Sequence, residues 1–197
     1  MTGGAPKRQL RRAITAFSVR NRNRKAASIE RFIEQTGSRS LLMCGALGSG
    51  TLANEGTVER RIAQRMDSVM AFDVVDLGPQ PWPFVVADAC RMPVGDGEYD
   101  LAVANAVIEH VGDETDQRRL VDEHVRVARH WVITTPNRWF PVESHTATLF
   151  RHWSPRWRAD RQEFTRLLSR REFRSLLPEN ARVVGRPWSA TFSAFSS

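Results

Sequence analysis

The 197 residues, 41% of them hydrophobic, are enough to bury one sizeable core and too few for two full domains. No uninterrupted apolar stretch approaches the roughly 18 residues that a membrane span needs, so we expect a cytoplasmic protein without a membrane span. The two cysteines, Cys44 and Cys90, belong to no CxxC or Cys/His cluster, which argues against a metal site and against a disulfide framework.

The net charge of +7 is unevenly distributed along the chain. Residues 1–36 hold nine basic and two acidic groups, residues 37–150 hold ten and sixteen, and residues 151–197 hold ten and four. Two basic ends therefore flank an acidic middle. A basic excess attracts nucleic acid, but here it lies outside the most motif-rich part of the chain. An arginine-rich solvated surface is the favoured interpretation, and nucleic acid binding is the alternative.

The N-terminal residues 1–23 combine glycine, proline and basic side chains with little apolar periodicity, so we expect a mobile arm there. Residues 24–197 should form the single folded domain. Its first element is predicted to be an amphipathic helix that ends at Gly37. The apolar positions that recur at helical spacing are Ala26, Ile29, Phe32 and Ile33.

Five short apolar runs follow, and each is a predicted strand. They are residues 41–44, 69–72, 84–87, 101–104 and 131–134. Because the runs are apolar on both faces, they suit a parallel sheet that is covered by helices. Apolar residues recur at helical spacing over residues 58–66 and 120–128, so strand and helix alternate. This alternation predicts an α/β fold with a Rossmann-like, doubly wound sheet and helices on both faces.

The C-terminal part follows a different pattern. Ser169 and Glu172 form a capping box ahead of a short helix that Pro178 ends. Two further runs, residues 181–184 and 190–195, are separated by a turn-rich segment. They predict a closing pair of antiparallel strands.

Candidate ligand-binding residues lie at the ends of the first two runs, because the crevice of an open α/β sheet lies beyond the carboxyl ends of its strands. The first run ends in a glycine-rich turn that allows close backbone approach to a ligand, with Gly45, Ala46 and Gly48 as candidates. The second run ends in Asp73, with Asp76 close behind. Either carboxylate can accept hydrogen bonds from ribose hydroxyls, and the sequence does not choose between them.

The third and fourth runs carry a recognisable pattern. The segment "FVVADACRMPVGDGEYDLAVANAVIEHVG", residues 84–112, resembles the S-adenosylmethionine-dependent class I methyltransferases, specifically the type 11 group. Members of that group read D-A-x-x-L-P-F-x-D-x-x-F-D-x-V-x-x-x-x-V-x-E-H. The resemblance implies S-adenosyl-L-methionine as the cofactor, with Asp88 bonded to the adenine amino group and the backbone amide of Ala89 facing the ring. It also implies that Asn105 and Ala106 line the methionine end.

The resemblance continues through "WVITTPNRWFPVESHTATLFRHWSP", residues 131–155, which looks like the fifth strand and acceptor-side loop of these enzymes. It implies a mostly parallel seven-stranded sheet whose last strand is antiparallel. Methyl transfer needs a general base only where the acceptor must lose a proton. The candidates for that base are His110, Glu143 and His145. Alternatively, these side chains only cap or fix their own segments.

Three functions stay open from the sequence. The favoured one is a methyltransferase for a small-molecule acceptor, because residues 105–108 read N-A-V-I and not the N-P-P-Y type of motif of amino-group methylation in nucleobases or proteins. The second is an RNA or protein methyltransferase that uses its basic ends. The third is a non-catalytic binding protein of the same fold, since Met43 stands where other members carry an acid. The sequence predicts no oligomeric state.

Overall fold

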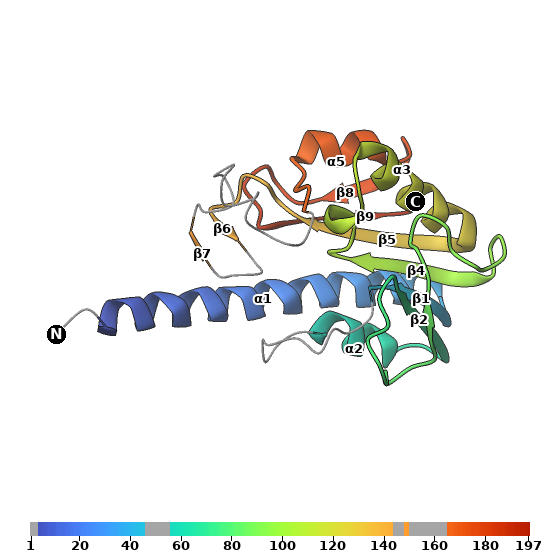
Figure 1. The fold of residues 1–197 in the computed structure, drawn as a ribbon, viewed down its shortest axis with the longest axis horizontal. Coiled ribbons are helices and arrows are strands. Elements are labelled where there is room, and N and C mark those ends of the chain that lie inside the picture. The colour runs from blue at the N-terminus through green and yellow to red at the C-terminus, as the bar shows by residue number, and fades with distance from the viewer. Residues whose placement is uncertain (1–3, 46–55, 144–147, 150–164) are drawn as a thin grey trace.

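The computed structural model describes residues 4–45, 56–143, 148–149 and 165–197, and within them a seven-stranded sheet and a separate two-stranded pair (Figure 1). The main sheet consists of β1 (Ser40–Cys44), β2 (Ser68–Asp73), β3 (Phe84–Val86), β4 (Tyr99–Asn105), β5 (Ala128–Pro136), β8 (Arg182–Val184) and β9 (Thr191–Phe195). The pair consists of β6 (Val142–Glu143) and β7 (Thr148–Leu149). The helices are α1 (Gly4–Thr36), α2 (Thr57–Ala63), the 3-10 helix η1 (Ile108–His110), α3 (Glu114–Val127) and α5 (Arg170–Leu176).

The strand order of the main sheet is β3-β2-β1-β4-β5-β9-β8. Strands β1 to β5 are parallel to one another, whereas β9 is antiparallel to both β5 and β8. The chain moves outward from β1 to β2 and β3 and then returns to the other side of β1 to form β4. This order confirms the predicted Rossmann-like sheet with an antiparallel last strand, and each predicted strand overlaps an observed one.

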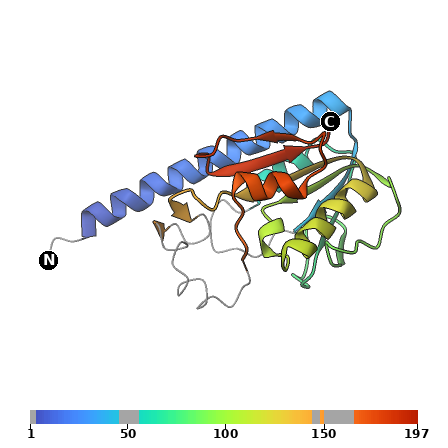
Figure 2. The same cartoon turned by 90° about the horizontal axis from the view of Figure 1, so that it is seen from above.

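Alternate residues of each central strand face two separate cores. In β1, Leu41 and Met43 pack with α1 and α2, whereas Leu42 and Cys44 pack on the side of α3 and α5. Figures 1 and 2 show these two sets of helices on opposite sides of the sheet. Met43 is only 1% exposed, so the position where the resemblance implies an acid is part of the core here.

Helix α1 begins well before the predicted start of the folded domain. It runs from Gly4 to Thr36, and its N-terminal half extends past the sheet (Figures 1 and 2). The boundary expected between residues 23 and 24 is therefore not an element boundary, although the mobility of residues 1–23 stays a prediction. Among the described residues, no helix combines the length and the apolar character that crossing a membrane requires.

The middle of α1 is attached to the sheet by contacts that lie one helical turn apart. Ile14 is 8% exposed, and the ring of Phe17 stacks on Phe140 with the centroids 5.4 Å apart. One turn further on, Nδ2 of Asn21 donates a hydrogen bond of 3.0 Å to Oγ1 of Thr191 in β9. These side chains recur every three or four residues and therefore share one face of the helix.

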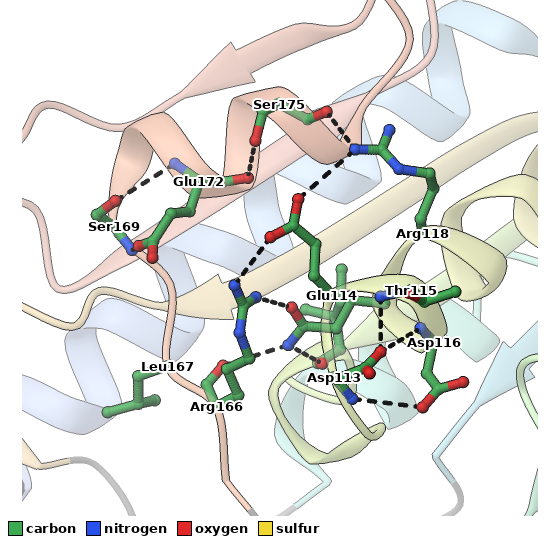
Figure 3. Close-up of polar contacts among 12 residues, drawn as sticks. Asp113, Glu114, Thr115, Asp116, Arg118, Arg166, Leu167, Ser169, Glu172 and Ser175 are labelled. Carbon is green, nitrogen blue, oxygen red and sulfur yellow. Dashed lines mark hydrogen bonds and ion pairs between the residues drawn. The ribbon is translucent and has the colours of Figure 1, made fainter.

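The predicted capping box of the C-terminal helix is confirmed. Ser169 caps α5: its Oγ accepts a hydrogen bond from the backbone N–H of Glu172, whose carboxylate accepts one from the backbone N–H of Ser169 (Figure 3).

Residues 74–83, between β2 and β3, form an irregular loop without a helix. Asp88 follows Asp73 by only fifteen positions, and β3 occupies three of them, so this connection is short.

Candidate active site

The candidate site lies at the carboxyl ends of β1, β2 and β4, where the strand order reverses. Cys44, the last residue of β1, pairs with Phe72 on one side and with Ala104 on the other. The residue that follows each of these three is a predicted ligand residue. The structure therefore brings Gly45, Asp73 and Asn105 to one edge of the sheet, at a topological switch point where α/β folds bind ligands.

Gly45 begins the turn that leaves β1. Its N–H donates to the carbonyl of Phe72 at 3.0 Å, and its φ is 80°, in the left-handed region that favours glycine. A Cβ at this position would lie only 2.6 Å from Cγ2 of Val107, so the space beside the backbone is already limited. The other two predicted residues of the turn, Ala46 and Gly48, lie outside the described residues.

The carboxylates of Asp73 and Asp76 both bind the loop that follows β2. Oδ1 of Asp73 accepts a hydrogen bond of 3.2 Å from the N–H of Val75, and Oδ1 of Asp76 accepts one of 2.9 Å from Gly78. Asp73 belongs to β2 and is half-buried, whereas Asp76 lies in the loop and is exposed. Asp73 is thus the nearer of the two to the Gly45 turn along the sheet edge.

Asp88 and Ala89 follow β3. Oδ1 of exposed Asp88 accepts a hydrogen bond of 2.8 Å from the N–H of Cys90, and Ala89 is 7% exposed within the core on the α3 side. Burial, followed by the charges of Asp88 and Asp116, raises the pKa of the Cys90 thiol to about 12. Because only a thiolate is a strong nucleophile, this cysteine is held in its unreactive form at neutral pH.

Asn105, at the end of β4, is fixed by a chain of polar side chains from three other elements. Its Nδ2 donates to Oε1 of Glu59 in α2 at 2.5 Å, and its Oδ1 accepts a hydrogen bond of 2.9 Å from Oγ1 of Thr134 in β5. The Nζ of Lys25 in α1 donates to that same Oγ1 at 3.5 Å. The next residue, Ala106, has a φ of 60°, which is unusual for a residue with a side chain.

The left-handed turn at Ala106 is held in place by two hydrogen bonds. Its N–H contacts both the carbonyl and Oγ1 of Thr134, each at 3.1 Å. Strained backbone of this kind persists only where the surroundings enforce it, and it is common at functional sites. The chain turns here at the point where the family resemblance puts the methionine end of a cofactor.

Glu109 is the most unusual carboxylate of the site. It is 0% exposed; its Oε2 accepts a hydrogen bond of 3.3 Å from Oγ1 of Thr135, and its Oε1 has no hydrogen-bond partner within the described part of the chain. Burial raises the pKa of Glu109 to about 7, although its own backbone N–H, the ammonium of Lys25 and the Thr135 hydroxyl act in the opposite direction. Near neutral pH this group is therefore divided between its two protonation states.

Sequence reasoning missed the charged residues behind Asn105. Lys25 and Glu59 lie on helix faces that also carry core residues: Lys25 is four positions before Ile29, and Glu59 is three positions before Ile62. A charged side chain within an apolar stripe was the available signal, because such groups are rarely buried unless paired. Burial lowers the pKa of Lys25, and the charges of Glu59 and Glu109 oppose that shift.

The three candidate general bases stay predictions. His110 lies in η1, is half-buried, and its backbone N–H donates to the carbonyl of Val107 at 2.8 Å. The backbone of Glu143 pairs with Thr148 in the β6–β7 pair, but its side chain lies outside the described residues. His145 also lies outside them.

The segment after β5, which was predicted to face the acceptor, is anchored by Asn137. Nδ2 of this buried side chain donates to the carbonyls of Pro187 and Ser189, each at 2.8 Å. Its Oδ1 accepts a hydrogen bond of 3.0 Å from the N–H of Trp139, whose ring is 61% exposed. This asparagine therefore joins the loop after β5 to the loop between β8 and β9.

Arg138 and Arg166 attach the segment before α5 to the site. The guanidinium of Arg138 binds Glu172 at 2.8 Å and the carbonyl of Leu167 at 2.9 Å. Arg166 forms a hydrogen bond with Gln117 and an ion pair of 3.3 Å with Glu114 at the start of α3 (Figure 3). The N–H of Arg166 also donates to the carbonyl of Glu109 at 2.7 Å. Arg138 thus supports the fold, whatever further role it has.

This arrangement is similar to that of known proteins. Residues 53–131, which extend from just before α2 into β5, match the family model described as a methyltransferase domain. A search of curated proteins found no match to this chain.

Solved structures share the fold of this chain at low sequence identity. N-methyltransferase NodS from Bradyrhizobium japonicum WM9 in complex with S-adenosyl-L-homocysteine is 15% identical, with a TM-score of 0.56 over 88% of this chain and 85% of that chain. A SAM-dependent methyltransferase from Archaeoglobus fulgidus is 12% identical, with a TM-score of 0.57 over 88% and 93%.

A third structure, 1,6-didemethyltoxoflavin-N1-methyltransferase from Burkholderia thailandensis with bound 1,6-didemethyltoxoflavin and S-adenosylhomocysteine, is 13% identical, with a TM-score of 0.53 over 100% of this chain and 92% of that chain. The match over residues 53–131 and the shared fold confirm the predicted resemblance to S-adenosylmethionine-dependent methyltransferases.

The residues of the candidate site fit this cofactor. The backbone turns at Gly45 with a φ of 80° and without a Cβ, which would overlap Val107, and the half-buried carboxylate of Asp73 stands at the next strand end. The buried carboxyl group of Glu109, whose Oε1 has no hydrogen-bond partner among the described residues, can supply a negative charge when it is ionised. A turn for close approach, a carboxylate for hydroxyl groups and a negative field for a sulfonium are all present.

Proposed function

We propose that this chain transfers a methyl group from S-adenosylmethionine to a small-molecule acceptor. The observation that carries the proposal is the order of Gly45, Asp73, Asp88 and Asn105 at successive strand ends of one sheet edge. An α/β sheet binds its ligand at this edge, and each residue type suits one part of the cofactor. The domain match that overlaps this region supports the same conclusion.

The small-molecule part of the proposal rests on the acceptor side of the site. The segment after β5 is crossed by α1, through the stack of Phe17 on Phe140, and is tied to the β8–β9 loop by Asn137. Such a segment suits an enclosed acceptor better than an extended polymer. Two of the solved relatives are N-methyltransferases by name, and one of them binds 1,6-didemethyltoxoflavin. That molecule is consistent with this size class.

When bound, the cofactor supplies an electrophilic methyl group on a sulfonium, and the protein supplies position and electrostatics. Asp73 would accept the ribose hydroxyls, Asp88 would accept the adenine amino group, and the fixed turn at Ala106 would hold the methionine end. Alignment of acceptor and methyl group alone can supply up to about 7–11 kcal/mol of the barrier reduction.

A general base is required only for acceptors that lose a proton on methylation. His110, Glu143 and His145 are our candidates, because imidazole and carboxylate groups can accept a proton near neutral pH. Replacement of the true base should lower turnover and leave cofactor affinity almost unchanged. A change that abolishes cofactor binding would instead assign that residue to the fold.

Cofactor binding is the first test of this function. S-adenosylhomocysteine should raise the melting temperature and give a measurable dissociation constant by calorimetry, since a ligand that binds the folded state stabilises it. Asp88→Asn should weaken this binding by roughly tenfold or more, because a polar group of the ligand would lose a charged acceptor. Asp122→Asn, at an exposed position of α3, is the matched control and should bind as the unchanged protein does.

Acceptor class is tested with the same preparation, by measuring S-adenosylhomocysteine formation with panels of small metabolites and of RNA. Turnover with a metabolite and none with RNA is the expected result. The RNA alternative is favoured by exposed arginines on α1, among them Arg8, Arg12, Arg20 and Arg24. RNA binding through them would weaken steeply with salt. A silent calorimeter and an unchanged melting temperature would support the non-catalytic alternative instead.

A further inference from the structure

Three charged groups from different elements, two of them buried and one half-buried, lie behind the carboxyl end of β4. They are Lys25 of α1, Glu59 of α2 and Glu109 of η1, and we refer to them as the buried charge cluster. Glu59 is 8% exposed and Glu109 is 0% exposed. The charges of Glu59 and Glu109 both act on the ammonium of Lys25, so the three groups are electrostatically coupled.

The cluster has direct connections to the residues that face the cofactor. Lys25 reaches Asn105 through the hydroxyl of Thr134, and Glu59 binds the amide of Asn105 directly. Glu109 follows Asn105 by four positions on the same segment, and its Oε2 binds the hydroxyl of Thr135, the residue next to Thr134. The two carboxylates therefore lie on both sides of the turn at Ala106.

The cluster is not electrically balanced. It holds two carboxylates and one ammonium, although Arg22 of α1 also acts on that ammonium, and Oε1 of Glu109 has no hydrogen-bond partner in the described chain. Burial of an uncompensated charge is costly, and a protein usually avoids this by pairing the charge or by neutralising it. Glu109 is neutralised in part by its raised pKa of about 7. A bound cation would provide the missing partner.

We propose that the buried charge cluster is an electrostatic subsite for the sulfonium of S-adenosylmethionine, and that Glu109 makes the protein favour this cation over the neutral thioether product. This inference rests on the proposed function. Glu109 is fully buried, so it acts on the ligand through its field and is a positioning residue, not a catalytic one. Fields between charges remain strong in a poorly solvated site.

The proposal implies a link between cofactor binding and proton release. A cation lowers the pKa of a nearby carboxyl group, so S-adenosylmethionine binding should expel the proton that Glu109 holds. The groups that face Glu109 are Lys25 from α1 and the hydroxyl of Thr135 from β5, with His110 beside it in η1. Glu59 acts on the same ammonium from α2, and Arg22 acts on it from α1.

The test compares the dissociation constants of S-adenosylmethionine and S-adenosylhomocysteine by calorimetry at pH 6, 7 and 8. The two ligands differ by one methyl group and one permanent charge. For the unchanged protein, the preference for S-adenosylmethionine should rise with pH, by up to about tenfold per unit below the pKa of Glu109. Measurements in two buffers of different ionisation enthalpy should show proton release with S-adenosylmethionine and little with the product.

Two variants assign this behaviour to the cluster. Glu109→Gln keeps the shape of the side chain but holds no charge, so the ligand preference should fall and lose its pH dependence. Lys25→Met removes the ammonium that lowers the pKa of Glu109, so the midpoint of the pH dependence should move to higher pH. Glu98→Gln, on the exposed loop before β4, is the matched control and should leave the profile unchanged.

Four results would overturn the inference. One is a preference that does not vary with pH in the unchanged protein, and another is a pH dependence that survives in Glu109→Gln. A pH dependence that appears only when an amine acceptor is added would assign the titrating group to the acceptor. Absence of binding by both ligands would remove the proposed function and this subsite together, whereas product binding with a flat preference removes only the subsite.

Discussion

At Gly45 two physical constraints act on one residue. The backbone has a φ of 80°, and an added Cβ would contact Cγ2 of Val107 at 2.6 Å. Gly78 shares the first constraint, with a φ of 71°, but has no atom within 4 Å of an added Cβ. A comparison of substitutions at these two glycines therefore distinguishes the effect of backbone strain from that of steric overlap.

We predict that Gly45→Ala destabilises the protein more than Gly78→Ala does. The left-handed backbone should cost each variant about 1–2 kcal/mol, and overpacking should add roughly 1–3 kcal/mol at position 45 only. Urea unfolding measures both values, and calorimetry should show weaker cofactor binding for Gly45→Ala alone. Val107→Ala in the same chain should recover part of the difference. Equal losses at both glycines would mean that Val107 adjusts freely.

The site residues that the sequence predicted are those that local pattern and topology define. Gly45, Asp73 and Asn105 each end a recognisable apolar run, and parallel strands bring such ends to one edge. Lys25 and Glu59 could not be placed in the same way. Their roles depend on contacts with Asn105 and Thr134, and the Lys25 contact spans 109 positions in sequence. The spacing of apolar residues along the sequence carries no information about such a distant partner.

At the scale of elements, the strands and the capping box of α5 were predicted because each depends on neighbouring residues only. Helix α1 differs, since its N-terminal half is held by distant partners. Asn21 binds Thr191, 170 positions away, and Phe17 stacks on Phe140. The corresponding sequence signal, Ile14 and Phe17 followed by polar Asn21 and Lys25, is too sparse to be read as a stripe.

These contacts give a prediction about truncation. Deletion of residues 1–12 should leave the melting temperature almost unchanged, because the contacts described above begin at Ile14. Deletion of residues 1–24 should lower it by roughly 5 °C or more, because buried apolar area and an aromatic stack are lost. Limited proteolysis should correspondingly begin at Arg8 or Arg12, which are exposed. An unchanged melting temperature for the longer deletion would mean that residues 13–24 are indeed a dispensable arm.

At the scale of the whole molecule, the excess of basic residues lies in other parts of the sequence than the site. The strand-end carboxylates belong to the acidic middle of the chain, whereas α1 and the C-terminal segment are basic. Two of the buried titratable groups have pKa shifts of opposite direction. Burial raises the pKa of Glu109 from 4.5 to about 7, and burial lowers the pKa of His124 from 6.5 to about 4.

The two shifts affect stability in the same pH range with opposite sign. The raised pKa of Glu109 contributes stability that is complete below pH 4.5 and is lost as pH rises to about 7. The lowered pKa of His124 contributes stability that is complete above pH 6.5 and is lost as pH falls to about 4. Between these limits the two contributions oppose each other and largely cancel.

Single substitutions should therefore reveal a pH dependence of the free energy of unfolding that largely cancels in the unchanged protein. Between pH 7 and pH 5, the free energy of unfolding of Glu109→Gln should fall by about 2 kcal/mol more than that of the unchanged protein, because only the His124 contribution remains. His124→Gln should show the reverse, with stability that falls as pH rises across the same range. Urea unfolding at pH 5, 6 and 7 measures both slopes. Parallel pH profiles for all three proteins would mean that neither group keeps its shifted pKa in the folded state, and the link between Glu109 and cofactor charge would fall with it.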